Sequence, residues 1–353
     1  MGTLERSYLK ENMTIHFTTF FDINYLSRGL TLINSIKENY KYFTLHLLCL
    51  DQETFDFFNN NIDYPEIKVI KLVEIENFFP ELLKCKKDRS KIEYFFTLSP
   101  FLPLYILKKY NLPHICSLDA DMKFYSSPLS LFKYLEDYSI IITPHKFSKE
   151  NSELNIYGKY NVSFQIFKND NTGVECLNDW KDRCIEWCKD EIDDQGRFAD
   201  QKYLDDWEEK FPNKVLSLYN ENGGLAVWNL NNYDIRYING KFMANNTEII
   251  FYHFHHFKIL NKNLAINGFF LYKAKSSIGI IKLYRNYWKS LRKWEIVKEK
   301  INVRNNLYSL SHYEILRHEK SIFILYLTRI FNVTDITKAK PFFKKIIWRI
   351  SSK

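Results

Sequence analysis

Two carboxylates stand one residue apart directly after a short apolar run near the middle of the chain. The run His114–Leu118 is typical of a buried strand, and Asp119 and Asp121 follow it. Carboxylate oxygens are hard ligands, which suit a divalent cation such as Mg²⁺ or Mn²⁺. A cation held there can neutralise a diphosphate and keep coordination positions open for it. The alternative is that one aspartate caps the following turn while the other is solvated.

Three histidines occur within four positions later in the chain. They are His253, His255 and His256, and they follow Thr247–Phe251, which we expect to be a strand. Imidazole is a good ligand for metals of the Mn²⁺ class, and a late strand can complete a site begun by two aspartates. A lone histidine is more often an ordinary core or surface residue, but three so close together favour the metal. We therefore expect His253, with His255 as second choice, to join the aspartates.

The elements that must position these side chains alternate between strand and helix. Strands are expected at Thr14–Phe20, Thr44–Leu50 and Ile67–Val73, with helical spacing from Leu26 onward between the first two. This order predicts a parallel sheet with right-handed crossovers, in which ligands bind beyond the carboxyl ends of the strands. The chain has no Gly-x-Gly-x-x-Gly segment, which disfavours a dinucleotide fold of the usual kind. Further strands are expected at Ile140–Thr143, Tyr160–Phe167 and Ile235–Ile238, the last paired with Thr247–Phe251, and a helix at Asn171–Glu191.

The segment from Leu118 to Asp121, with its aromatic tail Phe124-Tyr125, resembles the metal-binding signature of glycosyltransferases of the GT-A type. It looks closest to bacterial, retaining enzymes of family 8, and the resemblance spans residues 14–258. It implies an α/β fold with a mixed, mainly parallel sheet flanked by helices. It also implies metal-dependent transfer of a hexose from a nucleotide-sugar, expected to be a UDP-sugar, to a glycan or glycolipid acceptor. The implied pathway is bacterial surface polysaccharide assembly, such as lipopolysaccharide or capsule.

The same resemblance assigns roles near the reacting bond. The pair Asp200-Gln201 is similar to a family 8 pair placed beside the anomeric carbon, so Gln201 would face that carbon and Asp200 would orient the sugar. Asn161 would be a further sugar-orienting group, although Val162 and Ser163 depart from the small residues usual in that strand. For Asp200 the alternative is a helix cap, because a carboxylate is favoured at a helix start.

The resemblance also implies a nucleotide-sugar pocket. Asp22 and Tyr25 lie where the first strand meets its helix, and the alternatives for them are a helix N-cap and a core residue. Ser90 with Glu93 has the spacing of a capping box whatever the function, and the loop 222–229 carries Trp228, which is plausible for stacking on a sugar. For Arg89 the alternative is an exposed surface charge. The full set of donor-pocket candidates is Thr18, Thr19, Asp22, Tyr25, Arg89, Ser90, Tyr94, Ala120 and Lys258.

Composition and charge narrow the partners and the compartment. A net charge of +8 favours an anionic partner, and a nucleotide-sugar, an anionic membrane and nucleic acid all fit it. We find no nucleic-acid recognition motif and expect no such partner. The six cysteines form no paired zinc pattern, and Cys176, Cys184 and Cys188 share a helical face, so these three are expected to be buried thiols in a reducing compartment. With neither a signal-peptide pattern nor an apolar run of transmembrane length, we expect a cytoplasmic protein.

The pattern changes at about residue 259, where Lys/Arg-rich segments with aromatics and no strand alternation begin. We expect a catalytic domain over 1–258 and a helical basic extension over 259–353, with helices at Leu283–Trp288 and Ile322–Leu327. From Lys338 the basic and apolar residues fit an interfacial helix on the inner face of an anionic membrane, and a packed helical subdomain is the alternative.

Two other functions stay open at this point. A sugar-1-phosphate nucleotidyltransferase uses a similar sheet and metal, but it needs a Gly-rich basic loop that Phe17–Leu30 does not supply. A catalytically inactive glycan-binding scaffold is the non-enzymatic alternative, and the intact carboxylates and histidine argue mildly against it.

Overall fold

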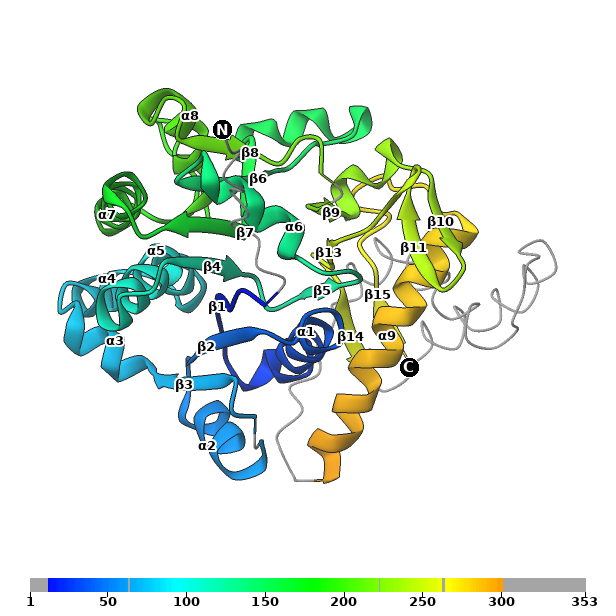
Figure 1. Ribbon diagram of the computed structural model, residues 1–353, viewed down its shortest axis with the longest axis horizontal. Helices are drawn as coiled ribbons and strands as arrows, with labels where there is room; N and C mark the ends of the chain where they lie inside the picture. The colour runs from blue at the N-terminus through cyan, green and yellow to red at the C-terminus, as the bar shows by residue number, and fades with distance from the viewer. Residues whose placement is uncertain (1–11, 63, 222, 262–263, 301–353) are drawn as a thin grey trace, which may run out of the picture.

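The computed structural model describes residues 12–62, 64–221, 223–261 and 264–300. In this part of the chain the central sheet has seven strands in the order β3-β2-β1-β4-β7-β6-β8 (Figure 1). Only β7 runs antiparallel to its neighbours, so the expected mixed, mainly parallel sheet is confirmed. The strands are β1 (Ile15–Phe21), β2 (Phe43–Cys49), β3 (Ile67–Lys71), β4 (His114–Leu118), β6 (Ile140–Pro144), β7 (Tyr160–Lys168) and β8 (Val215–Ser217).

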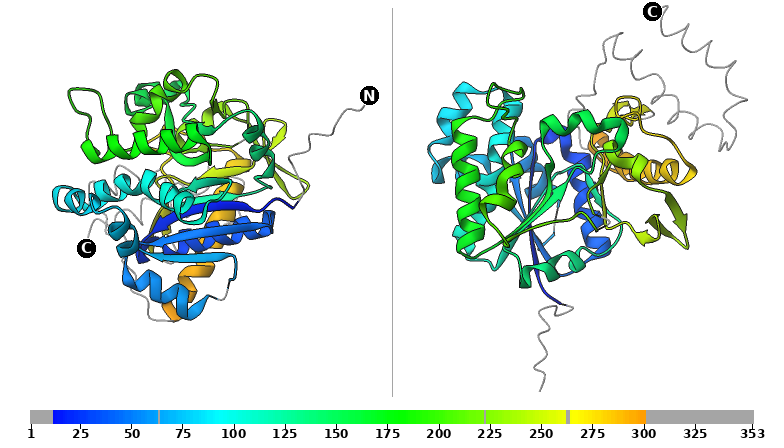
Figure 2. Two further views of the ribbon diagram at one scale, coloured as in Figure 1. Left: turned by 60° about the vertical axis from the view of Figure 1, so that its left-hand side comes forward. Right: turned by 90° about the horizontal axis from the view of Figure 1, so that it is seen from above.

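Helices cover both faces of this sheet, as the view from above in Figure 2 shows. The sequence of β2 is almost continuously apolar because both of its faces are buried. Leu45 and Leu47 belong to the core on one face of the sheet, and Leu48 belongs to the core on the other. The first face is covered by α1 (Leu26–Asn39), α2 (Gln52–Asn61) and α6 (Leu129–Phe132). The second face is covered by α3 (Leu72–Phe78), α4 (Leu82–Asp88), α5 (Lys91–Tyr110), α7 (Asn171–Glu186) and α8 (Trp207–Lys210).

Helix α1 follows β1 after one short 3₁₀ turn and buries the face that its sequence spacing predicted. Leu26, Leu30 and Ile33 are all buried in the core beneath it. Gly29 allows the first turn to lie against the sheet, because a Cβ there would come 2.2 Å from the Phe21 ring. The start of α1 is therefore fixed close to the carboxyl end of β1.

A second, three-stranded sheet has the order β5-β13-β9 and consists of β5 (Met122–Phe124), β13 (Phe251–His253) and β9 (Leu225–Ala226). His253 lies opposite Met122 in antiparallel pairing and opposite Ala226 in parallel pairing. The expected strand Thr247–Phe251 is therefore wrong in extent, since it divides into β12 (Thr247–Glu248) and β13. Because β13 pairs with the strand that follows Asp121, His253 comes next to the aspartates.

The pairing expected between Ile235–Ile238 and Thr247–Phe251 is also wrong. β10 (Ile235–Ile238) pairs with β11 (Lys241–Ala244), and β11 then pairs with β12. The two residues between β10 and β11, Asn239 and Gly240, both have positive φ, at 50° and 83°. An Asn-Gly pair with this geometry closes a hairpin at once, which leaves the next strand to pair with β11 instead.

The region after residue 257 contains two strands, although the sequence predicted helices there and no strands. β14 (Lys258–Asn261) and β15 (Leu264–Ile266) form an antiparallel pair, and helix α9 (Ile278–Lys300) follows. Helix α9 lies along α1 and β10, and Leu283, Tyr284 and Tyr287 are buried in the core shared with β9 and β13 (Figure 1). The expected helix at Leu283–Trp288 is thus confirmed, while the domain boundary at 258 stays a prediction.

The remaining expectations for the end of the chain, Ile322–Leu327 and the basic segment from Lys338, lie outside the described residues. None of the described helices, α9 included, is long and apolar enough to cross a membrane. All six cysteines are buried and free, which confirms the buried thiols expected at Cys176, Cys184 and Cys188. Short 3₁₀ helices complete the fold: η1 (Ile23–Tyr25), η2 (Lys133–Glu136), η3 (Lys149–Tyr157), η4 (Gln201–Asp206) and η5 (Val227–Asn232).

Candidate functional site

The two aspartates form a fixed turn at the carboxyl end of β4. The Asp119 amide donates a hydrogen bond to the Ser163 carbonyl of β7 at 3.0 Å, and the chain then continues into β5. The Nε2 atom of His253 lies 3.0 Å from Asp121 Oδ1 and 3.6 Å from Asp119 Oδ2. The structure therefore brings together the three residues that the sequence pointed to as metal ligands.

The second-choice histidine also reaches this place. Asp121, His253 and His255 each have a potential ligand atom within 4.8 Å of those of the other two. The turn 253–256, here called the histidine turn, is hydrogen-bonded to the turn 119–121, here called the acidic turn. The Phe254 amide donates to the Asp121 carbonyl at 2.9 Å. His256 follows in the left-handed region at φ 59°, a conformation that usually favours glycine.

Burial and mutual charge set the protonation of this cluster. Burial, together with the charge of Asp121, raises the pKa of Asp119 to about 6 in spite of His253. Burial alone would raise the pKa of Asp121 as well, but the charge and hydrogen bond of His253 hold it below its ordinary value. The pKa of His253 is raised, since both aspartates outweigh its burial. A positive charge is therefore favoured between the carboxylates, which is where a cation would bind.

A buried aromatic residue supports the histidines from behind. Trp228 packs edge-on against His253 and His255, with ring centroids 5.3 and 5.1 Å apart. Its indole nitrogen and the Asn229 amide both donate to the His145 carbonyl at 2.8 Å. Trp228 is only 4% exposed, so the expectation that it stacks on a sugar is wrong. It positions the histidine turn instead.

Asp200 is a buried carboxyl group near the same site. It is 3% exposed, and its Oδ2 atom has no hydrogen-bond partner among the described residues. Burial raises its pKa to about 7; the Ser99 hydroxyl opposes this and the charge of Asp119 adds to it. The preceding residue, Ala199, has φ 46°, a strained conformation for a residue with a side chain. The Trp180 indole donates to the Asp200 carbonyl at 2.8 Å, which helps to hold this segment.

The amides of the other two catalytic candidates have partners within the protein. Gln201 Nε2 donates to the Tyr157 carbonyl at 2.9 Å. Asn161 donates to the Thr143 carbonyl at 3.3 Å and accepts a hydrogen bond from the Ser163 amide at 3.1 Å. Their roles toward a sugar stay predictions.

The candidates at the end of β1 divide into buried and accessible groups. Thr18 and Thr19 are fully buried, and neither hydroxyl has a hydrogen-bond partner among the described residues. Asp22 is the N-cap of η1, as the structural alternative predicted, and also pairs with Lys91 at 2.8 Å. Tyr25 is 43% exposed and lies in electrostatic range of both metal-site aspartates. Of these residues, Tyr25 is the one whose side chain is open to a ligand beside the acidic turn.

The candidates on α4 and α5 are engaged away from that turn. The capping box is confirmed, since Ser90 accepts from the Glu93 amide at 3.4 Å and its own amide donates to Glu93 Oε2 at 2.8 Å. The buried Tyr94 hydroxyl donates to Glu76 at 2.9 Å. Arg89 donates to the Thr97 hydroxyl and, at 2.7 Å, to the Ile185 carbonyl. These contacts join α3, α4, α5 and α7 and do not involve the aspartate pair.

Two candidates remain, and one important residue was missed. Ala120 is buried in the core between the two aspartates, and Lys258 begins β14. The missed residue is Arg28, whose Nη2 donates to the Phe257 carbonyl at 2.9 Å and whose guanidinium lies 4.5 Å from the Tyr25 ring centroid. Its position three residues after Tyr25 on a helix, where such residues are neighbours, was the available signal.

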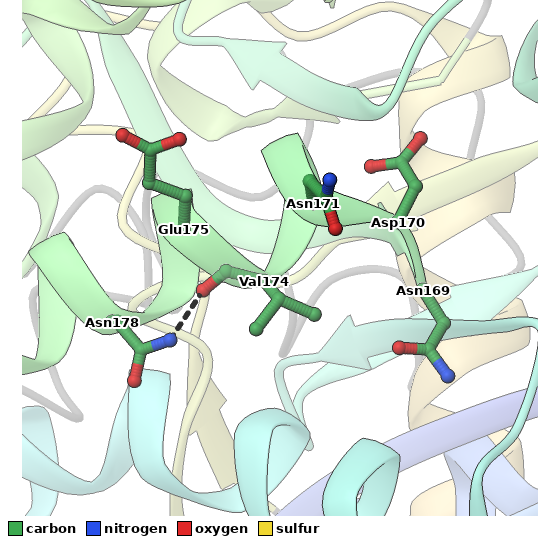
Figure 3. A pocket seen from close by; sticks show the side chains of 6 residues that line it. All are labelled: Asn169, Asp170, Asn171, Val174, Glu175 and Asn178. Atoms are coloured by element: carbon green, nitrogen blue, oxygen red, sulfur yellow. Dashed lines mark hydrogen bonds between the residues drawn. The ribbon is translucent and has the colours of Figure 1, made fainter.

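A surface hollow at the start of α7 lies elsewhere (Figure 3). Asn169 donates through its amide to the Pro113 carbonyl, so the hollow is beside the amino end of β4, opposite the aspartates. Asp170 is occupied as the N-cap of α7, accepting from the Gly173 amide at 2.9 Å. The hollow brings together no set of ligands or nucleophiles and has no evident part in the chemistry.

Comparison with known proteins gives distant relatives. No family model matches the chain. Two Bacillus subtilis proteins described as uncharacterized are similar to it. YfnD is 28% identical over 284 residues, covering 80% of this chain and 90% of YfnD. YfnF is 28% identical over 260 residues, covering 71% and 84% respectively.

Several solved structures are similar to the fold. Galactosyltransferase LgtC, in complex with donor and acceptor sugar analogues, is 13% identical with a TM-score of 0.47, over 86% of this chain and all of LgtC. Apo glycosyltransferase GlyE of Streptococcus pneumoniae is 13% identical with a TM-score of 0.46, over 81% and 64%. Apo mouse xyloside xylosyltransferase 1 is 13% identical with a TM-score of 0.42, over 68% and 97%. At TM-scores below 0.5, these likenesses establish no shared activity.

Proposed function

We propose that this protein is a metal-dependent glycosyltransferase that uses a nucleotide-sugar, with a UDP-hexose as the expected donor. The observation that carries the proposal is the contact of His253 with Asp121 at 3.0 Å and with Asp119 at 3.6 Å. This contact lies at the carboxyl end of a parallel strand, where open α/β sheets bind ligands.

The carboxylate oxygens and imidazole nitrogens of this cluster fit a divalent cation of the Mn²⁺ or Mg²⁺ type. Two carboxylates supply hard oxygen ligands, and the imidazoles of His253 and His255 favour Mn²⁺ over Mg²⁺. The raised pKa of Asp119, caused by burial and by Asp121, marks a place where a cation would relieve an electrostatic cost. When bound, such a cation supplies charge neutralisation for the leaving diphosphate.

The protein's own residues would bind and orient the donor around this point. Tyr25 offers a half-exposed ring for the nucleobase, next to Asp22 at the end of β1. Asp200, buried and in electrostatic range of Asp119, would orient the sugar with Asn161. Gln201 would face the anomeric carbon, and this role requires its amide to leave the Tyr157 carbonyl when the sugar binds.

For the acceptor, we propose a glycan or lipid-linked glycan of a bacterial surface polysaccharide. The Bacillus relatives support a bacterial setting. Transfer with retention of anomeric configuration is proposed from the Asp200-Gln201 pair, and NMR of the product would show it directly. An inverted product would instead require one carboxylate to act as a general base.

The decisive test is binding of nucleotides by calorimetry and thermal shift, with and without Mn²⁺. UDP and UDP-hexoses are expected to bind and to raise the melting temperature only when Mn²⁺ is present. ADP and CDP serve as comparison nucleotides, and donor hydrolysis reports turnover. Preferential binding of UTP with a sugar phosphate would favour a nucleotidyltransferase, and donor binding without any turnover would favour a scaffold. No binding of any nucleotide in Mn²⁺ would contradict the proposal.

A further inference from the structure

The guanidinium of Arg28 is held in place with most of its hydrogen-bonding capacity unused. It lies on the first turn of α1, half-buried, and stacks over Tyr25 at 4.5 Å. Of its five N–H donors, one bonds to a protein acceptor in the described part of the chain, the Phe257 carbonyl at 2.9 Å. Within those same residues, no carboxylate forms an ion pair with it. Such a pre-oriented cation is suited to an anionic ligand.

Hydrogen bonds connect this guanidinium to the acidic turn. Arg28 bonds to Phe257, the Phe257 amide bonds to the Phe254 carbonyl at 3.0 Å, and the Phe254 amide bonds to the Asp121 carbonyl at 2.9 Å. The positive charge of Arg28 is also one of the causes that lower the pKa of Asp121, after His253 and His255. Arg28 therefore lies beside the proposed metal site, on the α1 side of the histidine turn.

Helix α9 contributes a second polar group to the same place. The Tyr287 ring stacks flat on Phe254, with centroids 3.7 Å apart and an interplanar angle of 4°. Tyr287 is fully buried, and its hydroxyl has no hydrogen-bond partner among the described residues. That side chain lies in electrostatic range of Arg28, Asp121 and Tyr25.

Tyr284, one turn earlier on α9, has the hydrogen-bond partner that a buried tyrosine hydroxyl usually has. The Tyr284 hydroxyl is bonded to the Tyr252 hydroxyl at 2.9 Å, so it is satisfied within the core. Buried tyrosine hydroxyls usually find a partner in this way. The Tyr287 hydroxyl has no partner and the Arg28 guanidinium no ion pair within the described ranges, and the two groups lie in electrostatic range of each other. Together they indicate a site for a ligand with several acceptor oxygens.

We propose that Arg28 and Tyr287 bind the sugar-linked phosphate of the donor diphosphate, so that α9 forms one wall of the donor site. The inference rests on the proposed function, because the aspartates and histidines would hold the cation on the other side of the same diphosphate. The planar fork of arginine matches two phosphate oxygens, and the tyrosine hydroxyl donates to a third acceptor position. A ligand that lacks this phosphate loses these contacts.

The test compares UDP with UMP in the full-length protein with Mn²⁺. We expect Arg28→Gln to weaken UDP binding roughly 10- to 100-fold and UMP binding less than about 3-fold, since charge-assisted hydrogen bonds are lost only with UDP. Arg28→Lys keeps the charge without the fork and should fall between. Tyr287→Phe should weaken UDP selectively by about 5-fold, corresponding to one hydrogen bond.

Matched controls separate binding from folding. Arg285→Gln removes an exposed cation from α9, and Tyr284→Phe removes the neighbouring hydroxyl, so neither should change the UDP-to-UMP ratio. Mn²⁺ affinity without nucleotide, followed by electron paramagnetic resonance, should not fall in Arg28→Gln, because the variant removes a positive charge in electrostatic range of Asp121. If Arg28→Gln weakened UDP and UMP equally, or lost Mn²⁺ binding, Arg28 would only support the histidine turn. That result would overturn this inference and leave the proposed function standing. Failure of the wild type to bind either nucleotide would overturn the proposed function with it.

Discussion

The Nε2 atom of His253 lies 3.0 Å from Asp121 Oδ1, although the two residues are far apart in the sequence. The contact follows from strand pairing, because β13 runs antiparallel to β5 with His253 opposite Met122. The Phe254 amide then bonds to the Asp121 carbonyl, which fixes the histidine turn to the acidic turn. The proposed metal ligands are thus held together by backbone hydrogen bonds of the protein itself.

Removal of single ligands should weaken Mn²⁺-dependent donor binding in a defined order. We expect Asp119→Asn and Asp121→Asn to lower the affinity by at least about 100-fold and His253→Ala by less, because the carboxylates supply the charge that holds the cation. His255→Ala should be milder than His253→Ala. Calorimetry of Mn²⁺ and UDP measures each variant, and the exposed Asp182→Asn on α7 is the control. Wild-type activity in EDTA would contradict the assignment.

Replacement of Asp200 should separate turnover from donor binding. We expect Asp200→Asn to lower kcat by about 100-fold or more while Mn²⁺-UDP affinity changes less than about 3-fold, because the carboxyl group would act on the sugar. In the wild type, kcat should fall as the pH drops through about 7, since protonation removes the charge of Asp200.

The stability of Asp200→Asn is a second test, because the raised pKa of Asp200 determines the direction in which stability should change. The pKa of Asp200 is raised in the folded state from 3.8 to about 7, so wild-type stability falls as the pH rises from 3.8 to about 7, and the full cost is present above pH 7. Asp200→Asn should therefore be at least as stable as the wild type at pH 8 in urea denaturation. A variant that is destabilised and binds no donor would indicate a purely structural role.

Much of the fold could be predicted because its signals are local. The runs that became β1, β2 and β4 are buried almost throughout, β3 alternates, and the spacing of Leu26, Leu30 and Ile33 marks α1. The short strands β9, β11, β14 and β15 were missed, since two to four residues carry too little periodicity. The end of α7 at Glu186, earlier than expected, depends on Trp187 turning into extended backbone.

For the site, the sequence predicted which residues meet but not which neighbours support them. Asp119, Asp121 and His253 were identifiable because their types are chemically specific. Arg28 and Tyr287 carry no motif, and their importance depends on the packing of α1 and α9 around one turn. Arg89, a better match to a motif, is engaged instead by Thr97 and Ile185. Motifs report chemistry, whereas the placement of supporting cations depends on tertiary structure.

The basic end of the chain is predicted to bind anionic membranes. Deletion of residues 301–353 should reduce binding to phosphatidylserine vesicles in a flotation assay, because each Lys or Arg near the surface contributes about 1 kcal/mol. The cut must follow α9, since truncation after Phe257 would remove Leu283, Tyr284 and Tyr287 from the core and is expected to cause aggregation. Equal flotation of the full and shortened proteins would indicate a packed subdomain instead.

Three neighbouring histidines, on β1, β2 and β4, should make the fold acid-sensitive. His16 lies 6.1 Å from His46 and 5.7 Å from His114 between ring centroids. Burial, with the charge of neighbouring groups, lowers the pKa of His46 and of His114 to about 4. The unfolded chain therefore binds more protons than the folded one between pH 6.5 and 4, so stability is complete above pH 6.5 and falls with acidification. The loss of stability should approach about 3 kcal/mol each for His46 and His114 at pH 4, as the pKa change from 6.5 to about 4 implies.

Urea denaturation from pH 4 to 7.5 measures this loss of stability, and His46→Phe should make the stability depend less on pH. An unchanged slope in that variant would show that other groups cause the acid sensitivity.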